Sequence, residues 1–214
     1  MNNFIVSPQK DKQFRIWFRI ALVAIMLVYV KPLILYVDSN DVTILGLKHI
    51  LRSSWGGMFY MLYWITFVWI LGQLIMSFPT SMKWAKGSLW ATLIFYVIRV
   101  LFGYIIPMPE FGSPALATYH IVIGIISTLY TASLIIFGIH LVAQHGGRLK
   151  HLGIAILVWQ LLPFVCNIFY ATTNIYPTSP WFHISTMFLQ MFITIWVFYL
   201  MRQVFVPAWK ETGK

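Results

Sequence analysis

The sequence from Tyr119 to Val142 reads YHIVIGIISTLYTASLIIFGIHLV, and it contains no Asp, Glu, Lys or Arg. A helix needs roughly 20 consecutive apolar residues to cross the hydrocarbon core of a bilayer. This stretch is therefore long enough and apolar enough to span a membrane as a helix. Its apolar residues run continuously rather than alternating with polar ones, which excludes a strand of a membrane β-barrel.

Five further stretches of the same character fill most of the chain. Only 9% of the residues are charged and 60% are hydrophobic, whereas a soluble domain carries roughly 25% charged residues. The sequence therefore predicts an all-α membrane protein with six transmembrane helices in one bundle. The predicted parts are an N-terminal segment, 1–13, the spans 14–37, 57–78, 88–106, 119–142, 153–171 and 182–205, and a tail, 206–214.

The positive charges predict how the helices cross the membrane. Three Lys or Arg residues lie on one side, namely Lys31, Lys48 and Arg52. Eleven lie on the other, namely Lys10, Lys12, Arg15, Arg19, Lys83, Lys86, Arg148, Lys150, Arg202, Lys210 and Lys214. Cytoplasmic loops carry an excess of Lys and Arg, so we expect both termini in the cytoplasm and the protein in a bacterial inner membrane. The net charge of +10 follows from this topology, and no nucleic-acid partner is expected.

Arg99 is the charged residue that this topology does not explain. It lies near the middle of the third span, where a charged side chain is costly unless it faces the bundle interior or water. The five acidic residues all fall in loops or terminal segments. Neutral polar residues at similar depth are Gln190, Asn167, Tyr130 and Thr131. One hypothesis is a mid-membrane site for an anion, a quinone or a lipid headgroup; the alternative is that Arg99 snorkels outward or joins helices through amides.

Two histidines form a second candidate site. His120 and His183 each lie within two residues of the outer end of a predicted span, and these two helices run in the same direction. Histidines at matched depth are the axial ligands that a six-coordinate haem requires. A haem b site is therefore one hypothesis, while a polar tip in the headgroup region is the other.

Small and aromatic residues give further expectations about packing. Gly124, Thr131 and Gly138 are spaced by seven residues, and small residues at helical spacing let a neighbouring helix approach closely. We therefore expect this helix to lie centrally in the bundle. Trp residues near the span ends form an interfacial belt, and the deeper Trp64 and Trp159 are interpreted as packing residues. Residues 42–55 are predicted to form a short helix in the plane of the interface.

No motif identifies a catalytic centre, so the sequence favours a non-catalytic protein. It contains no Walker loop, dinucleotide glycine fingerprint or nucleophile elbow, and the spans contain no carboxylates. Three functions stay open. The first is a membrane subunit or accessory component of a larger envelope complex, with lipids and other membrane proteins as partners. The second is a small carrier, channel or lipid-handling protein built around Arg99, and the third is a haem- or quinone-binding membrane anchor.

Overall fold

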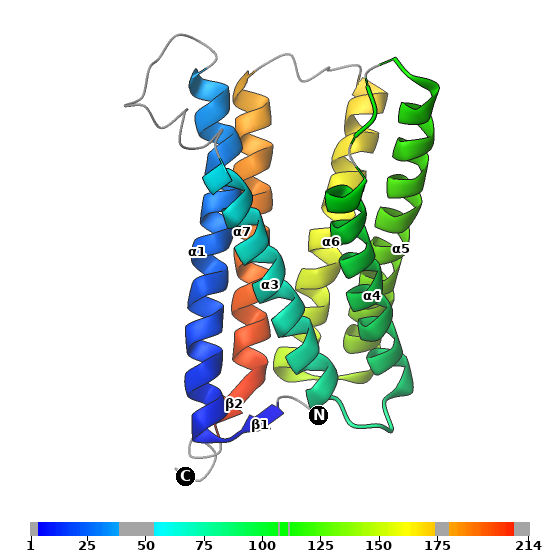
Figure 1. Cartoon of the computed structure of the whole chain (residues 1–214). Helices are drawn as coiled ribbons and strands as arrows, with labels where there is room; N and C mark the ends of the chain where they lie inside the picture. Colours follow the sequence, from blue (N-terminus) through cyan, green and yellow to red (C-terminus); the bar gives the residue numbers. More distant parts are fainter. Residues whose placement is uncertain (1–3, 39–53, 107, 111, 174–179, 208–214) are drawn as a thin grey trace.

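Six long helices make up most of the protein in a computed structural model, which describes residues 4–38, 54–106, 108–110, 112–173 and 180–207 (Figure 1). All six are long and apolar enough to cross a membrane. This confirms the expected membrane-crossing helices. Their bounds are α1 Pro8–Asp38, α3 Ser54–Ser77, α4 Lys83–Ile105, α5 Pro114–Gln144, α6 Gly147–Thr173 and α7 Pro180–Val204.

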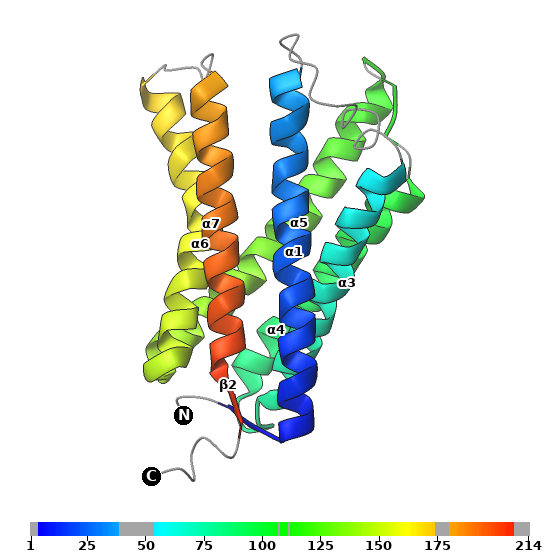
Figure 2. The ribbon, with the colours of Figure 1, turned by 90° about the vertical axis from the view of Figure 1, so that its left-hand side faces the viewer.

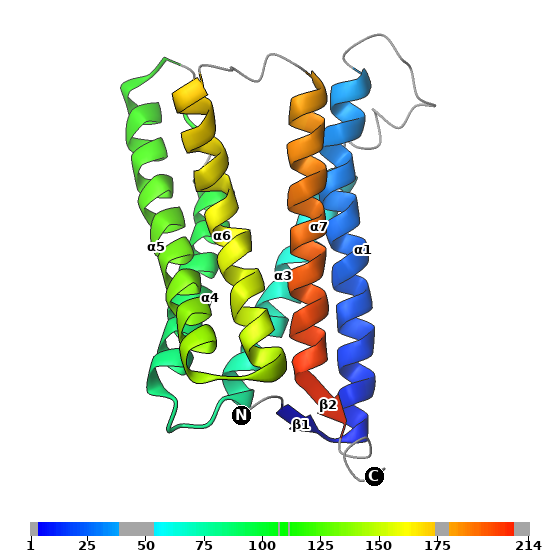
Figure 3. The ribbon, with the colours of Figure 1, turned by 180° about the vertical axis from the view of Figure 1, so that it is seen from behind.

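The six helices pack side by side in a closed ring. Each helix contacts the next one along the chain, from α3 through α4, α5 and α6 to α7, and α1 closes the ring by contacting both α3 and α7. Figures 2 and 3 show the ring from two further sides. Successive helices run in opposite directions along the ring (Figure 1).

The helices extend past most of the predicted spans. Helix α1 begins at Pro8, α4 at Lys83 and α5 at Pro114. Proline is well tolerated in the first turn of a helix because the amide hydrogen it lacks would have no intrahelical partner there. The predicted spans counted only the apolar residues, whereas the helices continue into the polar residues on either side. The predicted interfacial helix lies outside the described residues over 42–53.

A two-stranded parallel ladder, which the sequence did not predict, joins the two ends of the chain (Figure 3). Strand β1, Phe4–Val6, pairs with strand β2, Phe205–Pro207, which follows α7 directly. The Phe4 ring packs against Phe78 at a centroid distance of 4.9 Å and against Phe205 at 5.7 Å. The ladder thus ties the N-terminal segment to the end of the last helix. We call this end of the ring the clasped end.

A buried carboxylate stabilises the clasped end. Asp11, on the first turn of α1, is only 1% exposed. It accepts a hydrogen bond of 2.8 Å from Nε of Arg15 and forms ion pairs with Arg15 and with Arg202 of α7. Arg202 also donates a 2.8 Å hydrogen bond to the carbonyl of Phe205. Asp11, which the sequence placed in a terminal segment outside the spans, therefore joins α1 to α7 and β2.

Helix α5 lies in the wall of the ring, so the expectation that it is central was wrong. It packs mainly against α4 and α6. The small residues serve the contact with α6, where a Cβ built on Gly153 would lie 2.8 Å from the carbonyl oxygen of Gly138. A Cβ built on Gly124, by contrast, would meet nothing within 4 Å. Only one of the two glycines that suggested a central helix is used for close packing.

Candidate functional site

A cavity of about 730 Å³ lies inside the ring, in the half away from the clasped end. We call it the central cavity. Every one of the six helices contributes to its wall. The lining residues are Val28, Tyr29, Tyr60, Tyr63, Trp64, Tyr96, Arg99, Val100, Gly103, Tyr104, Ile123, Tyr130, Thr131, Trp159, Gln160, Pro163 and Gln190.

The ring is filled by packed apolar side chains between the cavity and the clasped end. Phe67 and Leu74 of α3, Phe137 of α5 and Phe198 of α7 are all 0% exposed. Phe67 also contacts both Tyr96 and Trp159 of the cavity wall, with ring centroids 4.7 and 6.1 Å apart. The central cavity is therefore closed toward the clasped end by a dense aromatic and aliphatic layer.

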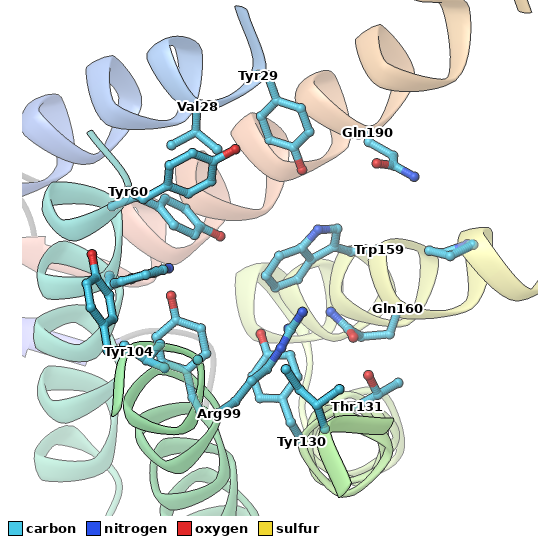
Figure 4. Close-up of a pocket in the computed structure, with 17 residues that line it drawn as sticks. Val28, Tyr29, Tyr60, Arg99, Tyr104, Tyr130, Thr131, Trp159, Gln160 and Gln190 are labelled. Carbon is cyan, nitrogen blue, oxygen red and sulfur yellow. The ribbon is translucent and has the colours of Figure 1, made fainter. Parts of the chain in front are cut away.

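Arg99 carries the positive charge of the cavity wall. Its side chain extends from α4 into the cavity and lies near Tyr130, Thr131 and Gln160 (Figure 4). It makes no hydrogen bond or ion pair with the part of the chain that the structure describes. No acidic residue is among the lining residues that the structure describes. The cavity thus presents one arginine whose charge the described lining does not neutralise.

Arg99 lies off-centre along helix α4, while its depth in a membrane stays a prediction. Helix α4 begins at Lys83, five residues before the predicted span, because Lys83, Trp84 and Lys86 continue the helix beyond its apolar part. Arg99 is six residues from the other end of α4 at Ile105, about 9 Å along the helix axis. The arginine is therefore closer to the end of the ring that is away from the clasp.

The structure brings together Arg99 and three of the residues proposed as its partners. Gln190 of α7 and Tyr130 and Thr131 of α5 all line the central cavity. The backbone of the fourth, Asn167, lies in α6, while its side chain is outside the described part of the structure. Whether these residues bind a ligand stays a prediction, but their shared location around one cavity is now a structural fact.

Sequence reasoning missed the aromatic wall of the cavity. Five tyrosines besides Tyr130 line it, together with two tryptophans that had been interpreted as packing residues. Trp64 and Tyr104 meet edge to face at 5.0 Å, and the rings of Tyr96 and Tyr130 lie 5.6 Å apart. A signal was present in α4, where residues 96, 99, 100, 103 and 104 recur at helical spacing and share one face.

Hydroxyl groups give this wall a polar character. The Thr194 hydroxyl donates a 2.7 Å hydrogen bond to the carbonyl of Gln190, so the Tyr29 hydroxyl is the donor in its 3.1 Å hydrogen bond to Thr194. The Tyr96 hydroxyl is buried and has no partner among the described residues. Leaving a buried polar group unpaired costs about 1–3 kcal/mol.

His120, one of the two histidines of the haem hypothesis, is not among the described residues of the cavity wall. His120 is exposed on α5, and its ring is 5.8 Å from that of Tyr119. The side chain of His183, on α7, is outside the described part. Helix α6 separates α5 from α7 in the ring. Among the described residues, no group of three or more His, Cys, Asp or Glu side chains is placed to hold a metal ion.

Comparison with known proteins gives no relative from which a function can be transferred. No protein-family model, no curated protein sequence and no solved structure matches the chain. The function is therefore argued from the central cavity and its chemistry.

Proposed function

We propose that this chain is a multi-pass membrane protein that binds a small organic anion in the central cavity and carries it across the membrane. The observation that supports this most directly is Arg99, which faces a cavity lined by all six helices and has no acidic residue beside it among the described side chains. A charged side chain within a membrane segment is expensive, and such residues commonly mark substrate pathways. An anion bound beside Arg99 would offset that cost.

The cavity wall indicates what kind of anion would fit. Small-molecule sites are typically about 300–1,000 Å³, and the central cavity, at about 730 Å³, falls within that range. One arginine without a neighbouring acid favours a single carboxylate or phosphate, which its planar guanidinium can bind with two hydrogen bonds. Tyrosine and tryptophan rings favour a planar apolar body. We therefore propose an aromatic or otherwise unsaturated monoanion as the ligand.

A carrier also needs access from one side at a time. The packed layer that includes Phe67, Phe137 and Phe198 separates the cavity from the clasped end. We propose that the structure corresponds to a state in which the ligand enters from the opposite end. Release would then require the packed layer and the clasped end to open.

The proposed orientation places the clasped end in the cytoplasm of a bacterial cell. The support is the excess of Lys and Arg on that side, eleven against three. A fluorescent protein fused to the C-terminus should fluoresce, because it folds in the cytoplasm, and alkaline phosphatase inserted after Gly112 should be active. Alkaline phosphatase activity from the C-terminal position would contradict the orientation.

Ligand binding is tested by thermal stability of the detergent-solubilised protein. A ligand at 100 times its Kd stabilises the folded state by about 2.7 kcal/mol. We expect 2-naphthoate to raise Tm, and the neutral isostere 2-naphthamide to have a much smaller effect. In Arg99→Gln the effect of naphthoate should disappear, and in Arg99→Lys it should be reduced. Lys150→Gln removes an exposed positive charge far from the cavity and should respond like the wild type.

Two results would contradict the proposal. One is an equal rise of Tm with the acid and the amide, and the other is an unchanged response of Arg99→Gln. If no organic anion stabilises the protein, and a second membrane protein co-purifies with both the wild type and Arg99→Gln, the function as a subunit of a larger complex would be favoured instead.

A further inference from the structure

A second hollow, separate from the central cavity, lies between α1 and α7 at the clasped end of the ring. It has a volume of about 160 Å³. Its floor is apolar, with Phe18 4% exposed and Phe198 0% exposed, and its rim includes Tyr199, which is 54% exposed. The hollow therefore opens on the outer surface of the ring, where lipid would lie. We call it the α1–α7 groove.

Three arginines surround this groove. Arg15 and Arg19 lie four residues apart on one face of α1, and Arg202 faces them from α7. Asp11 beneath them pairs with Arg15 and Arg202, so three positive charges and one negative charge leave the cluster at +2. The exposed Arg19 makes no hydrogen bond or ion pair within the described part of the chain.

The position of the arginines matches that of a lipid headgroup. Arg202 lies two residues before the end of α7, and the part of α7 that precedes it is mostly apolar. Guanidinium groups bind phosphate oxygens through charge-assisted, often paired hydrogen bonds, and basic pockets between membrane helices bind anionic headgroups. Tyr199 at the rim has the amphipathic side chain that suits this depth.

We propose that Arg15, Arg19 and Arg202 bind the phosphate of one anionic phospholipid in the α1–α7 groove. Arg15 and Arg202 are held in place by Asp11, and Arg19 supplies the guanidinium that has no partner within the described chain. A zwitterionic lipid would bring its own cation close to the arginine cluster, so an anionic lipid is preferred. Because the bound lipid contacts α1 and α7 together, it would stabilise the contact that closes the ring.

Binding is measured by titrating short-chain phosphatidylglycerol into the full-length protein in a neutral detergent and counting bound lipids by native mass spectrometry. Parallel titrations use phosphatidylcholine of the same chain length and inorganic phosphate. We expect one tightly bound phosphatidylglycerol. Arg19→Gln should weaken the Kd roughly tenfold, because it removes a charge-assisted hydrogen bond to the phosphate; this corresponds to about 1.4 kcal/mol. Lys12→Gln, an exposed change of the same charge on α1 outside the groove, is the matched control and should bind like the wild type.

The variants also separate a loss of binding from a loss of folding. Arg19→Gln should have the Tm of the wild type in detergent without lipid, because Arg19 has no partner to lose among the described residues. If the Tm of Arg19→Gln differs from that of the wild type, Arg19→Lys serves as the second variant. It keeps the positive charge and should show a Kd between those of the wild type and Arg19→Gln. Equal binding of phosphatidylcholine, wild-type binding by both Arg19 variants, or displacement of the lipid by inorganic phosphate at equal concentration would each overturn the proposal.

Discussion

Asp11 shows how much a single residue can contribute to closing the ring. Asp11 is 1% exposed, and its carboxylate forms ion pairs with two arginines that belong to different helices. Replacing it by asparagine would leave Arg15 and Arg202 close together without a negative charge between them. Breaking one side of a buried charge pair is strongly destabilising, because the remaining charge stays desolvated.

We predict that Asp11→Asn lowers the free energy of unfolding by about 2 kcal/mol, which corresponds to a fall in Tm of about 4–8 °C. About half of the Arg15 side chain is exposed to solvent, so water compensates part of the charge that loses its partner. Thermal unfolding in a neutral detergent measures the effect. Lys12→Gln, which removes a charge from the next residue of the same helix, should change Tm by less than about 2 °C. Equal melting temperatures for Asp11→Asn and the wild type would show that the ion cluster does not stabilise the fold.

Arg99 marks the limit of residue-scale reasoning from the sequence. An arginine within an apolar run indicates a polar interior. Gln190, Tyr130 and Thr131 could be predicted as its neighbours because they lie at similar depth in other spans. The tyrosines of α3 and α1 could not be predicted to line the cavity, because their position there depends on which faces of the six helices meet. A single sequence indicates how deep each residue lies along its span, whereas the face that each helix turns toward the interior is decided by packing.

At the scale of elements, the contact between α5 and α6 depends on a glycine. A Cβ on Gly153 would lie 2.8 Å from both the carbonyl oxygen of Gly138 and the Cβ of Leu141. Neither atom is the flexible end of a side chain, so the two helices must move apart to admit a methyl group. Overpacking of this kind costs about 1–3 kcal/mol.

We predict that Gly153→Ala lowers Tm by about 2–6 °C, although alanine favours the helix itself by about 1 kcal/mol. The same substitution at Gly124 is the control, because a Cβ there meets nothing within 4 Å. Gly124→Ala should leave Tm unchanged or raise it slightly. Identical behaviour of the two variants would mean that α5 and α6 do not approach each other as closely as described.

The strands β1 and β2 are elements that the sequence could not reveal. Each has three residues, which is too short for a recognisable alternation of apolar and polar side chains. Their pairing joins residues about 200 positions apart along the chain. Long-range pairing of this kind is decided by the packing of the helices that bring the two segments together, so no local pattern encodes it.

We predict that Phe4→Ala detaches strand β1 from the clasped end. The Phe4 ring is 3% exposed between Phe78 and Phe205, so its loss removes contacts with both. Because a terminal segment can unfold locally, the expected result is faster hydrogen exchange of the Phe205 and Val206 amides with a Tm within about 4 °C of the wild type. Ile5→Ala, at a side chain that is 61% exposed, should leave the exchange unchanged. Unchanged exchange in Phe4→Ala would contradict the role of this ring.

For the whole molecule, the sequence predicted the class of fold but not the shape of its interior. The length and apolar character of each span follow from the composition of the chain, because a lipid-facing surface needs few charges. The sequence suggested a bundle with α5 at its centre, whereas the structure has a ring with a cavity. Gly124 has space around it, while Gly138 contacts α6. Equal spacing of small residues does not say which of them touch a neighbour.

Filling the cavity tests whether it is the place where the ligand binds. Thr131 of α5 lines the central cavity, and Leu129, two residues earlier, is 42% exposed and is not part of its wall. We predict that Thr131→Trp abolishes the rise of Tm caused by 2-naphthoate, because the indole would occupy space beside Arg99 that the ligand needs. Leu129→Trp adds the same side chain to the surface of the same helix, where tryptophan is well accommodated, and should keep the naphthoate response. Because both variants retain Arg99, a difference between them reports occupancy of the cavity rather than loss of charge. A naphthoate response that survives in Thr131→Trp but is lost in Arg99→Gln would place the anion at Arg99 outside the central cavity.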